Sequence, residues 1–203
     1  MAATPSSRLE PDARAALLRT AAIAIEAGLG NVAATLPDAA QVPRALDEPR
    51  ASFVTLTIDH ALRGCCGTLE PARPLLLDVW HNAQASAFRD SRFRPLTVGE
   101  WRRSRLEVSV LSPCERIVVA DEHELLRTLV PGRDGLVLVW RGRRATFLPK
   151  VWEQVADAQE FVARLKHKAG WAAGFWAADM EAWRYETEIM AVDDPAELAS
   201  AAP

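Results

Sequence analysis

The most unusual stretch of this sequence is Leu62-Arg63-Gly64-Cys65-Cys66-Gly67-Thr68, which places two adjacent cysteines between two glycines. In an extended strand, neighbouring side chains point to opposite faces, so Cys65 and Cys66 do not share a face. Arg63 lies on the Cys65 face, and a guanidinium near a thiol favours the reactive thiolate. Glycine within a strand often marks a bulge or the close approach of a ligand or another backbone. Cys65 is therefore the candidate nucleophile, and Cys66 the candidate core residue.

Other interpretations of these cysteines stay open. Both thiols would also suit small buried positions in a core, which is a common place for cysteine. A vicinal disulfide between them is a further alternative, although it strains the intervening peptide. A zinc site is disfavoured, because His60, Cys65 and Cys114 lack the short paired spacing of zinc ligands. We expect neither a metal nor a cofactor.

Length and composition describe an ordinary folded protein. The chain has 203 residues, 49% of them hydrophobic and 25% charged, with a formal net charge of −3. This size suits one domain or two small ones with a real core, and the composition excludes disorder of the whole chain. The slightly acidic balance argues against nucleic acid as a partner, and no run of about 20 apolar residues is available to cross a membrane. The polar start and the three cysteines predict a cytoplasmic protein with reduced thiols.

Hydrophobic spacing predicts the secondary structure. Apolar residues recur at helical spacing in four segments, at residues 10–27, 74–88, 121–130 and 157–170. Four segments alternate as strands do, at residues 52–58, 62–68, 106–110 and 183–189. Asp59-His60 predicts a tight turn between the first two strands, and Arg141-Gly142 predicts a second hairpin. Thr97 and Glu100 have the spacing of a capping box, which predicts a short helix.

Hairpins that alternate with helices predict an α+β fold, with a mostly antiparallel sheet and flanking helices. Residues 116–120 are expected to extend the strand over 106–110, beyond a bend at Pro113. Residues 31–50 are expected to form a surface connection with a short helix. We expect a flexible tail over 1–8, a single domain over 9–190 and a second flexible tail over 191–203.

Five motifs, in this order, resemble those of the AMMECR1 domain family: LRGCCGTLEP, AFRDSRFRPLT, LEVSVLSP, GRDGLVL and RRATFLPKVWEQ. The resemblance covers residues 9–190, and the family has Ile where this chain has Cys66. Bacterial and archaeal members are called AmmeMemoRadiSam system protein A. The resemblance implies two unequal lobes with a cleft between them. It also implies a modification pathway shared with a Memo-like protein and a radical SAM protein, although the biochemical activity of the family is not established.

The resemblance also supplies candidate site residues around the nucleophile. The residues that it assigns to substrate binding are Arg63, Gly64, Gly67, Thr68, Arg89, Asp90, Arg92, Phe93, Ser109, Thr146 and Trp152. Glu107 is a weak candidate base, and pairing with Arg63 is an equal alternative for it. Arg63, Arg89 and Arg92 would form an anion pocket beside the thiol, suited to acyl or phosphoryl-like chemistry on a small anionic substrate. The sequence supplies no complete set of nucleophile, base and orienting group.

A second hypothesis makes the chain a binding module without catalysis. The loop over residues 89–105 is rich in arginine, and arginine contributes strongly to protein interfaces. This loop would dock the Memo-like protein or a shared substrate. The alternative for the same arginines is an ordinary solvated face that nearby acidic residues balance.

Overall fold

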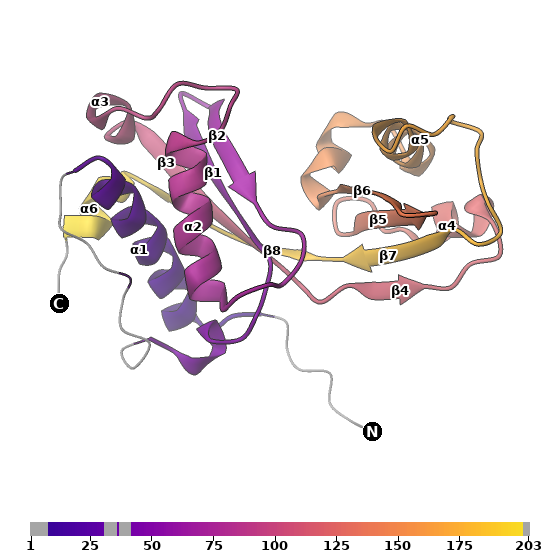
Figure 1. Ribbon diagram of the computed structural model, residues 1–203, viewed down its shortest axis with the longest axis horizontal. Helices are drawn as coiled ribbons and strands as arrows, with labels where there is room; N and C mark the ends of the chain where they lie inside the picture. The colour runs from indigo at the N-terminus through magenta and orange to yellow at the C-terminus, as the bar shows by residue number, and fades with distance from the viewer. Residues whose placement is uncertain (1–7, 31–35, 37–41, 201–203) are drawn as a thin grey trace. The chain divides into compact units, whose positions relative to one another are not determined.

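The computed structural model describes residues 8–30, 36 and 42–200. Their contacts divide the chain into two compact units, one from Met1–Leu111 with Glu188–Pro203 and the other from Ser112–Thr187 (Figure 1). Each unit holds one four-stranded sheet flanked by helices. The predicted α+β class with antiparallel sheets is therefore confirmed. Among the described residues, no helix is both long and apolar enough to cross a membrane.

The sheet of the first unit has the strand order β2-β1-β3-β8. Its strands are β1 (Ser52–Ile58), β2 (Ala61–Gly67), β3 (Ser104–Leu111) and β8 (Thr187–Asp193). Its α-helices are α1 (Pro11–Gly28), α2 (Leu75–Phe88), α3 (Val98–Trp101) and α6 (Pro195–Ser200). β1 is antiparallel to both β2 and β3. The helices predicted over 10–27 and 74–88 are thus present, as is the hairpin that turns at Asp59-His60.

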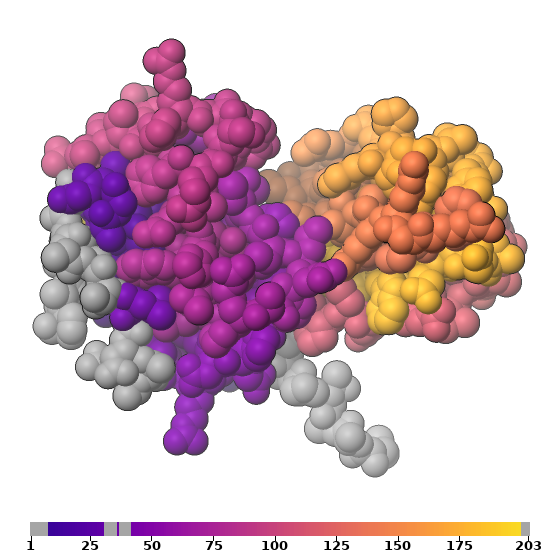
Figure 2. Space-filling view, in the orientation of Figure 1, coloured from indigo at the N-terminus to yellow at the C-terminus, as the bar shows by residue number. Residues whose placement is uncertain are grey.

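Helices α1 and α2 pack on one face of this sheet (Figure 1), and the magenta atoms of α2 lie at the surface of the first unit (Figure 2). Val54 of β1 and Val108 of β3 are fully buried in the core beneath them. Even-numbered residues of these two strands therefore face the helices, and odd-numbered residues face away. Glycine permits the close contact of the two helices, because a Cβ at Gly28 would lie 2.1 Å from the Phe88 ring.

The sheet of the second unit has the strand order β4-β7-β5-β6. Its strands are β4 (Glu115–Ile117), β5 (Gly135–Trp140), β6 (Arg143–Phe147) and β7 (Glu181–Tyr185). Its helices are α4 (Glu122–Thr128), η3 (Pro149–Gln154) and α5 (Ala158–Lys168). Asp121 and Asp157 cap α4 and α5, each accepting a 2.8 Å hydrogen bond from a backbone N–H of the first turn. Leu136, Phe161 and Leu165 are fully buried in its core.

Two strand predictions were wrong in the same region. Residues 183–189 form parts of two strands, since β7 ends at Tyr185 and β8 begins at Thr187 in the other sheet. Residues 115–117 do not extend β3 but pair with β7 as the separate strand β4. Ser112 and Glu186 join the two crossing segments through hydrogen bonds of 2.9 Å. The alternation of apolar and polar residues indicates which side chains of a strand are buried. It does not indicate which sheet the strand joins.

The C-terminal segment also differs from the expected flexible tail. Residues up to Asp193 complete β8, and Pro195–Ser200 form α6. Ala196, Leu198 and Ala199 pack against the first core, so apolar side chains of α6 contact the rest of the first unit. In the connection over 31–50, the described residues include the short helix η2 (Arg44–Leu46). Residues 31–35 and 37–41, like the expected tail residues 1–7, lie outside the described part.

The contact between α2 and β2 generates the first prediction. A Cβ at Gly64 would lie 2.2 Å from the backbone carbonyl oxygen of Ser86, which belongs to a regular helix and has little freedom to move. We expect Gly64→Ala to lower the free energy of unfolding by about 1–3 kcal/mol, the usual cost of overpacking. Urea unfolding followed by tryptophan fluorescence measures this change.

Gly99→Ala is the matched control, because a Cβ at Gly99 has no heavy atom within 4 Å. We expect this variant to unfold at the wild-type urea concentration or slightly above it. Equal stability of the Gly64→Ala variant and the wild type would contradict the tight contact.

Candidate functional site

The two adjacent thiols lie on opposite faces of the first sheet. Cys66 pairs with Val54, whose side chain is buried beneath the helices. Cys65 pairs with Thr55, which lies on the face away from the helices, and both residues are partly buried. Residues opposite each other in antiparallel strands share a face, so the Cys65 side chain belongs to the face opposite α1 and α2. None of the three cysteines, all of which are described, forms a disulfide.

Thr55 joins Cys65 to Glu107 in one row across three strands. It is opposite Cys65 on one side and opposite Glu107 on the other. Its hydroxyl donates a 3.4 Å hydrogen bond to Cys65 Sγ. Because neighbouring strands lie about 4.8 Å apart, the backbones of Cys65 and Glu107 are separated by about 10 Å. A proton moving between thiol and carboxylate would therefore pass through the Thr55 hydroxyl or a water molecule.

Sequence reasoning missed Thr55, and a β-bulge explains why. A regular hairpin with the two-residue turn Asp59-His60 would place Thr55 opposite Gly64. The register shifts by one residue after Leu56, because Arg63 is an extra residue in β2. This shift brings Cys65 opposite Thr55. The glycine beside Arg63 is the signal for a bulge in the sequence, but it does not specify the direction of the shift.

A carboxylate and a guanidinium hold the outer edge of β2 at Cys65. The backbone N–H of Cys65 donates to Asp90 Oδ2 at 2.9 Å, and Arg92 Nη2 donates to the Cys65 carbonyl at 3.2 Å. Arg92 also binds Asp90 through Nη2 at 2.7 Å and Nε at 2.9 Å. Hydrogen bonds from Arg92, and then the Cys65 N–H, hold the pKa of the Asp90 carboxyl well below its usual range. We call this pair the Asp90–Arg92 clamp.

On the side of β2 that faces β1, the Ser86 hydroxyl lies between backbone groups of the two strands. Cys66 N–H donates to Ser86 Oγ at 2.8 Å, and Ser86 Oγ donates to the Val54 carbonyl at 2.7 Å. The Ser86 side chain of α2 thus bridges two backbone groups of β2 and β1. Burial, followed by the charges of Asp90 and Cys65, raises the pKa of the Cys66 thiol. Cys66 is therefore held in its protonated form to higher pH than an ordinary thiol.

Arg63 pairs with Glu100, not with Glu107 as the alternative prediction had it. Its Nε and Nη2 donate to the two carboxylate oxygens at 2.9 and 3.0 Å. Glu100 also accepts hydrogen bonds from the backbone N–H and the hydroxyl of Thr97. These bonds complete the predicted capping box of α3. These contacts, with Arg63 first, lower the pKa of Glu100 to about 2. Because Arg63 is the extra residue of the bulge, strand alternation did not determine its direction.

The three arginines of the expected anion pocket all bind groups of the protein. Arg63 and Arg92 have carboxylate partners and approach the Phe93 ring, with guanidinium carbons 5.7 and 5.5 Å from its centroid. Arg89 donates to the His81 carbonyl of α2 at 3.3 Å. The charges of Arg63 and Arg92 are therefore balanced within the protein.

The other motif residues of the first unit support the sheet. Thr68 Oγ1 donates to the buried Asp78 at 2.7 Å, which ties the end of β2 to α2. A Cβ at Gly67 would lie 2.3 Å from the Phe53 ring, so this ring rests on the glycine. Ser109 is buried opposite Phe53 on β3.

Thr146 and Trp152 belong to the second unit. Thr146 Oγ1 and the Tyr185 hydroxyl share a 2.8 Å hydrogen bond, and both residues are buried. The Trp152 indole donates to the Asp134 carbonyl at 2.7 Å and stacks on Phe161 at 3.9 Å between ring centroids. The cleft expected between the two lobes stays a prediction.

Comparisons with known proteins agree with the motifs. The AMMECR1 family model matches residues 18–190. Protein MJ0810 of Methanocaldococcus jannaschii is 36% identical over 157 residues, which cover 75% of this chain and 78% of that protein. A Thermotoga maritima protein is 37% identical over 150 residues, covering 72% and 81% of the two chains. The crystal structure of uncharacterized protein PH0010 from Pyrococcus horikoshii matches with a TM-score of 0.78 and 33% identity, covering 88% of this chain and 91% of that one.

The Asp90–Arg92 clamp generates a prediction for stability. Asp90→Asn removes a charged acceptor, and we expect the free energy of unfolding at pH 7 to fall by about 1.5–3 kcal/mol. The pKa of this carboxyl is lower in the folded chain than the value of about 3.9 in an unfolded chain. The ionised group therefore contributes its full stability above about pH 4, and this contribution declines as the pH falls further. The free energies of unfolding of the wild type and Asp90→Asn should therefore converge between about pH 4 and pH 2. Urea unfolding at a series of pH values measures this.

Asp47→Asn is the control, since Asp47 is exposed at the end of η2. We expect it to unfold like the wild type at pH 7. If the free energies of unfolding of the wild type and Asp90→Asn differ by the same amount from pH 7 down to pH 2, the Asp90 charge does not stabilise the fold.

Proposed function

Since this chain belongs to the AMMECR1 family, we propose that it is the A component of a modification pathway shared with a Memo-like protein and a radical SAM protein, and that Cys65 is its reactive thiol. The observation that carries this proposal is the placement of Cys65 Sγ. The sulfur lies on the sheet face opposite α1 and α2 and accepts a hydrogen bond from Thr55, and the Asp90–Arg92 clamp binds the backbone of the same residue. The pathway operates in the cytoplasm, where its thiols stay reduced.

The surroundings of Cys65 support a role as nucleophile. The Thr55 hydroxyl donates to the sulfur, and a donor in this place can also hydrogen-bond a thiolate that forms during a reaction. The clamp fixes the backbone N–H and carbonyl of the same residue, and the Thr55 hydroxyl contacts its sulfur, so the Cys65 backbone and its Sγ each have a bonded partner. Fixed geometry of this kind is what a reacting group needs, because it reduces the entropy lost on reaching the transition state.

Glu107 has the role of proton acceptor in this proposal. It occupies the third position of the row that begins at Cys65, with the Thr55 hydroxyl between them. In this step the Thr55 O–H turns from the Cys65 sulfur toward Glu107, the Thr55 oxygen accepts the thiol proton, and the Thr55 hydroxyl proton passes to the Glu107 carboxylate. The hydroxyl therefore acts as a relay and ends the transfer unchanged.

Arg92 supplies the contact for a small anionic substrate. It uses Nε and Nη2 for the clamp, and its side chain is 54% exposed. Within the described residues, the hydrogen bonds of Arg92 leave its Nη1 group for a carboxylate or phosphate of the substrate, which Arg binds well. This contact would lie beside Cys65, because Arg92 already touches the Cys65 carbonyl.

Alkylation of the native protein tests the reactive thiol. In a Cys114→Ser background, iodoacetamide at pH 7 should label Cys65 several times faster than Cys66, as peptide mass spectrometry can determine. The raised pKa of the Cys66 thiol leaves less of Cys66 as thiolate at pH 7. The difference in labelling rate between Cys65 and Cys66 should therefore narrow as the pH rises. Thr55→Val, which removes the donor to Cys65 Sγ and keeps the side-chain shape, should slow the labelling of Cys65.

Binding to the Memo-like protein distinguishes the adaptor alternative. Cys65→Ser should keep the fold and the affinity for this partner while it abolishes the activity of the reconstituted pathway. Cys66→Ser is the matched variant and should retain activity. If Cys65 is inert to alkylation and Cys65→Ser leaves the pathway active, the chain is a docking module and the nucleophile proposal fails.

A further inference from the structure

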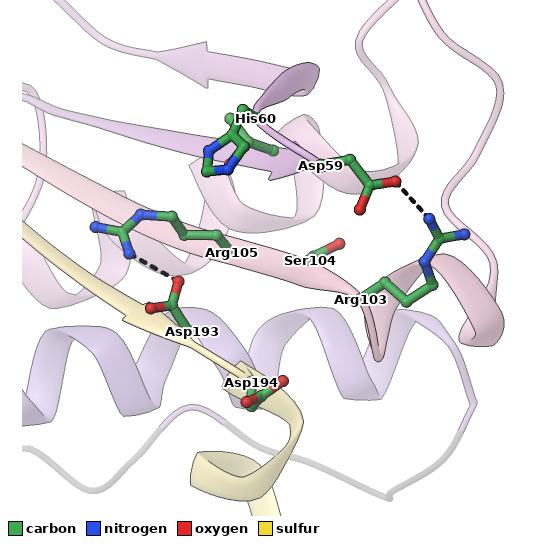
Figure 3. A pocket seen from close by; sticks show the side chains of 8 residues that line it. Asp59, His60, Arg103, Ser104, Arg105, Asp193 and Asp194 are labelled. Atoms are coloured by element: carbon green, nitrogen blue, oxygen red, sulfur yellow. Dashed lines mark hydrogen bonds and ion pairs between the residues drawn. The ribbon is translucent and has the colours of Figure 1, made fainter.

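A second polar site lies at the end of the first sheet, away from the clamp. It is a cavity of about 160 Å³ between the β1–β2 turn, the start of β3 and the end of β8 (Figure 3). All eight lining residues are polar or charged, among them Asp59, His60, Arg103, Arg105 and Asp194. Pockets for drug-sized molecules are larger, at about 300–1,000 Å³, and mostly apolar. The cavity therefore suits a small hydrophilic molecule.

Charges of both signs alternate around the cavity. Arg103 pairs with Asp59, and Arg105 Nη1 pairs with Asp193 Oδ1 at 2.7 Å (Figure 3). Asp194 adds a third carboxylate to the lining. An anion would approach three carboxylates here and a cation would approach two guanidiniums, whereas a molecule with both charges has a favourable partner for each. The lining thus favours a zwitterion over either simple ion.

The two ion pairs leave donors and acceptors for such a ligand. All four side chains are exposed, at 63% and 75% for Arg103 and Asp59 and at 48% and 75% for Arg105 and Asp193. Exposed pairs of this kind contribute little to stability, so a ligand can exchange with them at small cost. In the described part of the chain, each pair joins one guanidinium nitrogen to one carboxylate oxygen. The remaining guanidinium N–H groups can donate to a ligand carboxylate, and the remaining carboxylate oxygens can accept from an ammonium group.

We infer that this cavity is a binding site for a small amino acid in its zwitterionic form. The ligand carboxylate binds the Arg105 side of the cavity, and its ammonium group binds the carboxylates of Asp193 and Asp194. The volume of about 160 Å³ is room for an amino acid with a short side chain, since about 10–15 Å³ on the same measure holds one water molecule.

The cavity adjoins the thiol row on the same sheet face. Thr57 and Arg105 are opposite each other, two residues along from Thr55 and Glu107. Two residues in a strand span about 7 Å, so a bound amino acid would lie one row away from Cys65. The inference does not depend on the chemistry of Cys65, because none of the cavity residues belongs to the thiol row.

Titration of the labelled protein with L-alanine tests the inference by NMR. At constant ionic strength, L-alanine should produce saturable shifts of the backbone amide signals of His60, Arg105 and Asp194. Propionate lacks the ammonium group of alanine, and ethylammonium lacks the carboxylate. Each should bind about tenfold more weakly or worse, because each loses one set of charged hydrogen bonds. Equal binding of either simple ion, or the absence of saturable shifts with L-alanine, would overturn the inference.

Variants locate the binding. Arg105→Gln and Asp194→Asn should each weaken L-alanine binding by about tenfold, the effect of one lost charged hydrogen bond. Arg102→Gln and Asp47→Asn change exposed residues outside the cavity and should bind L-alanine like the wild type. Cys65→Ser should also bind normally, so a failure of the thiol proposal and a failure of this inference give different results. Binding that survives both cavity substitutions would place the ligand elsewhere.

Discussion

The hydrogen bond from the backbone N–H of Cys65 to Asp90 is the contact on which the site depends. β2 is an edge strand, and the outward N–H and carbonyl groups of an edge strand need partners. At Cys65, a carboxylate accepts from the N–H and a guanidinium donates to the carbonyl, as a neighbouring strand would. Because Asp90 and Arg92 also bind each other, the edge is closed by one ion pair. The strand is thereby held in a fixed position, with Cys65 Sγ on the sheet face opposite α1 and α2.

The glycines of the motif follow from the same packing. Helix α2 lies so close to β2 that only a residue without Cβ fits at Gly64, and the same closeness lets the Ser86 hydroxyl reach between the two strands. On the sheet face opposite the helices, the Phe53 ring packs directly against Gly67. The two cysteines between them therefore have different surroundings, one facing a helix and the other facing the row with Thr55. The inserted hydroxyl and the bulge at Arg63 are local departures from regular pairing that set this arrangement.

Sequence patterns predicted most of the elements, because apolar spacing and capping residues act locally. The α1 and α2 helices, the first hairpin and the capping box of Thr97 with Glu100 all follow from residues close together in the chain. The partners of Arg63 and Cys65 could not be predicted in this way. One extra residue in β2 moved Thr55 opposite Cys65 and turned Arg63 to Glu100, and a register shift of this kind depends on tertiary packing. The division of residues 183–189 between two sheets likewise depends on tertiary packing, which local patterns do not specify.

Amide hydrogen exchange at Cys65 tests the central claim most directly. If the Asp90–Arg92 clamp holds the edge of β2, the Cys65 amide is protected in the wild type and exchanges at least about tenfold faster in Asp90→Asn. The Thr68 amide, which donates to the Ser52 carbonyl at 2.9 Å, should keep its protection in both proteins. A Cys65 amide that exchanges like an unprotected group in the wild type, or that does not respond to the substitution, would contradict the account.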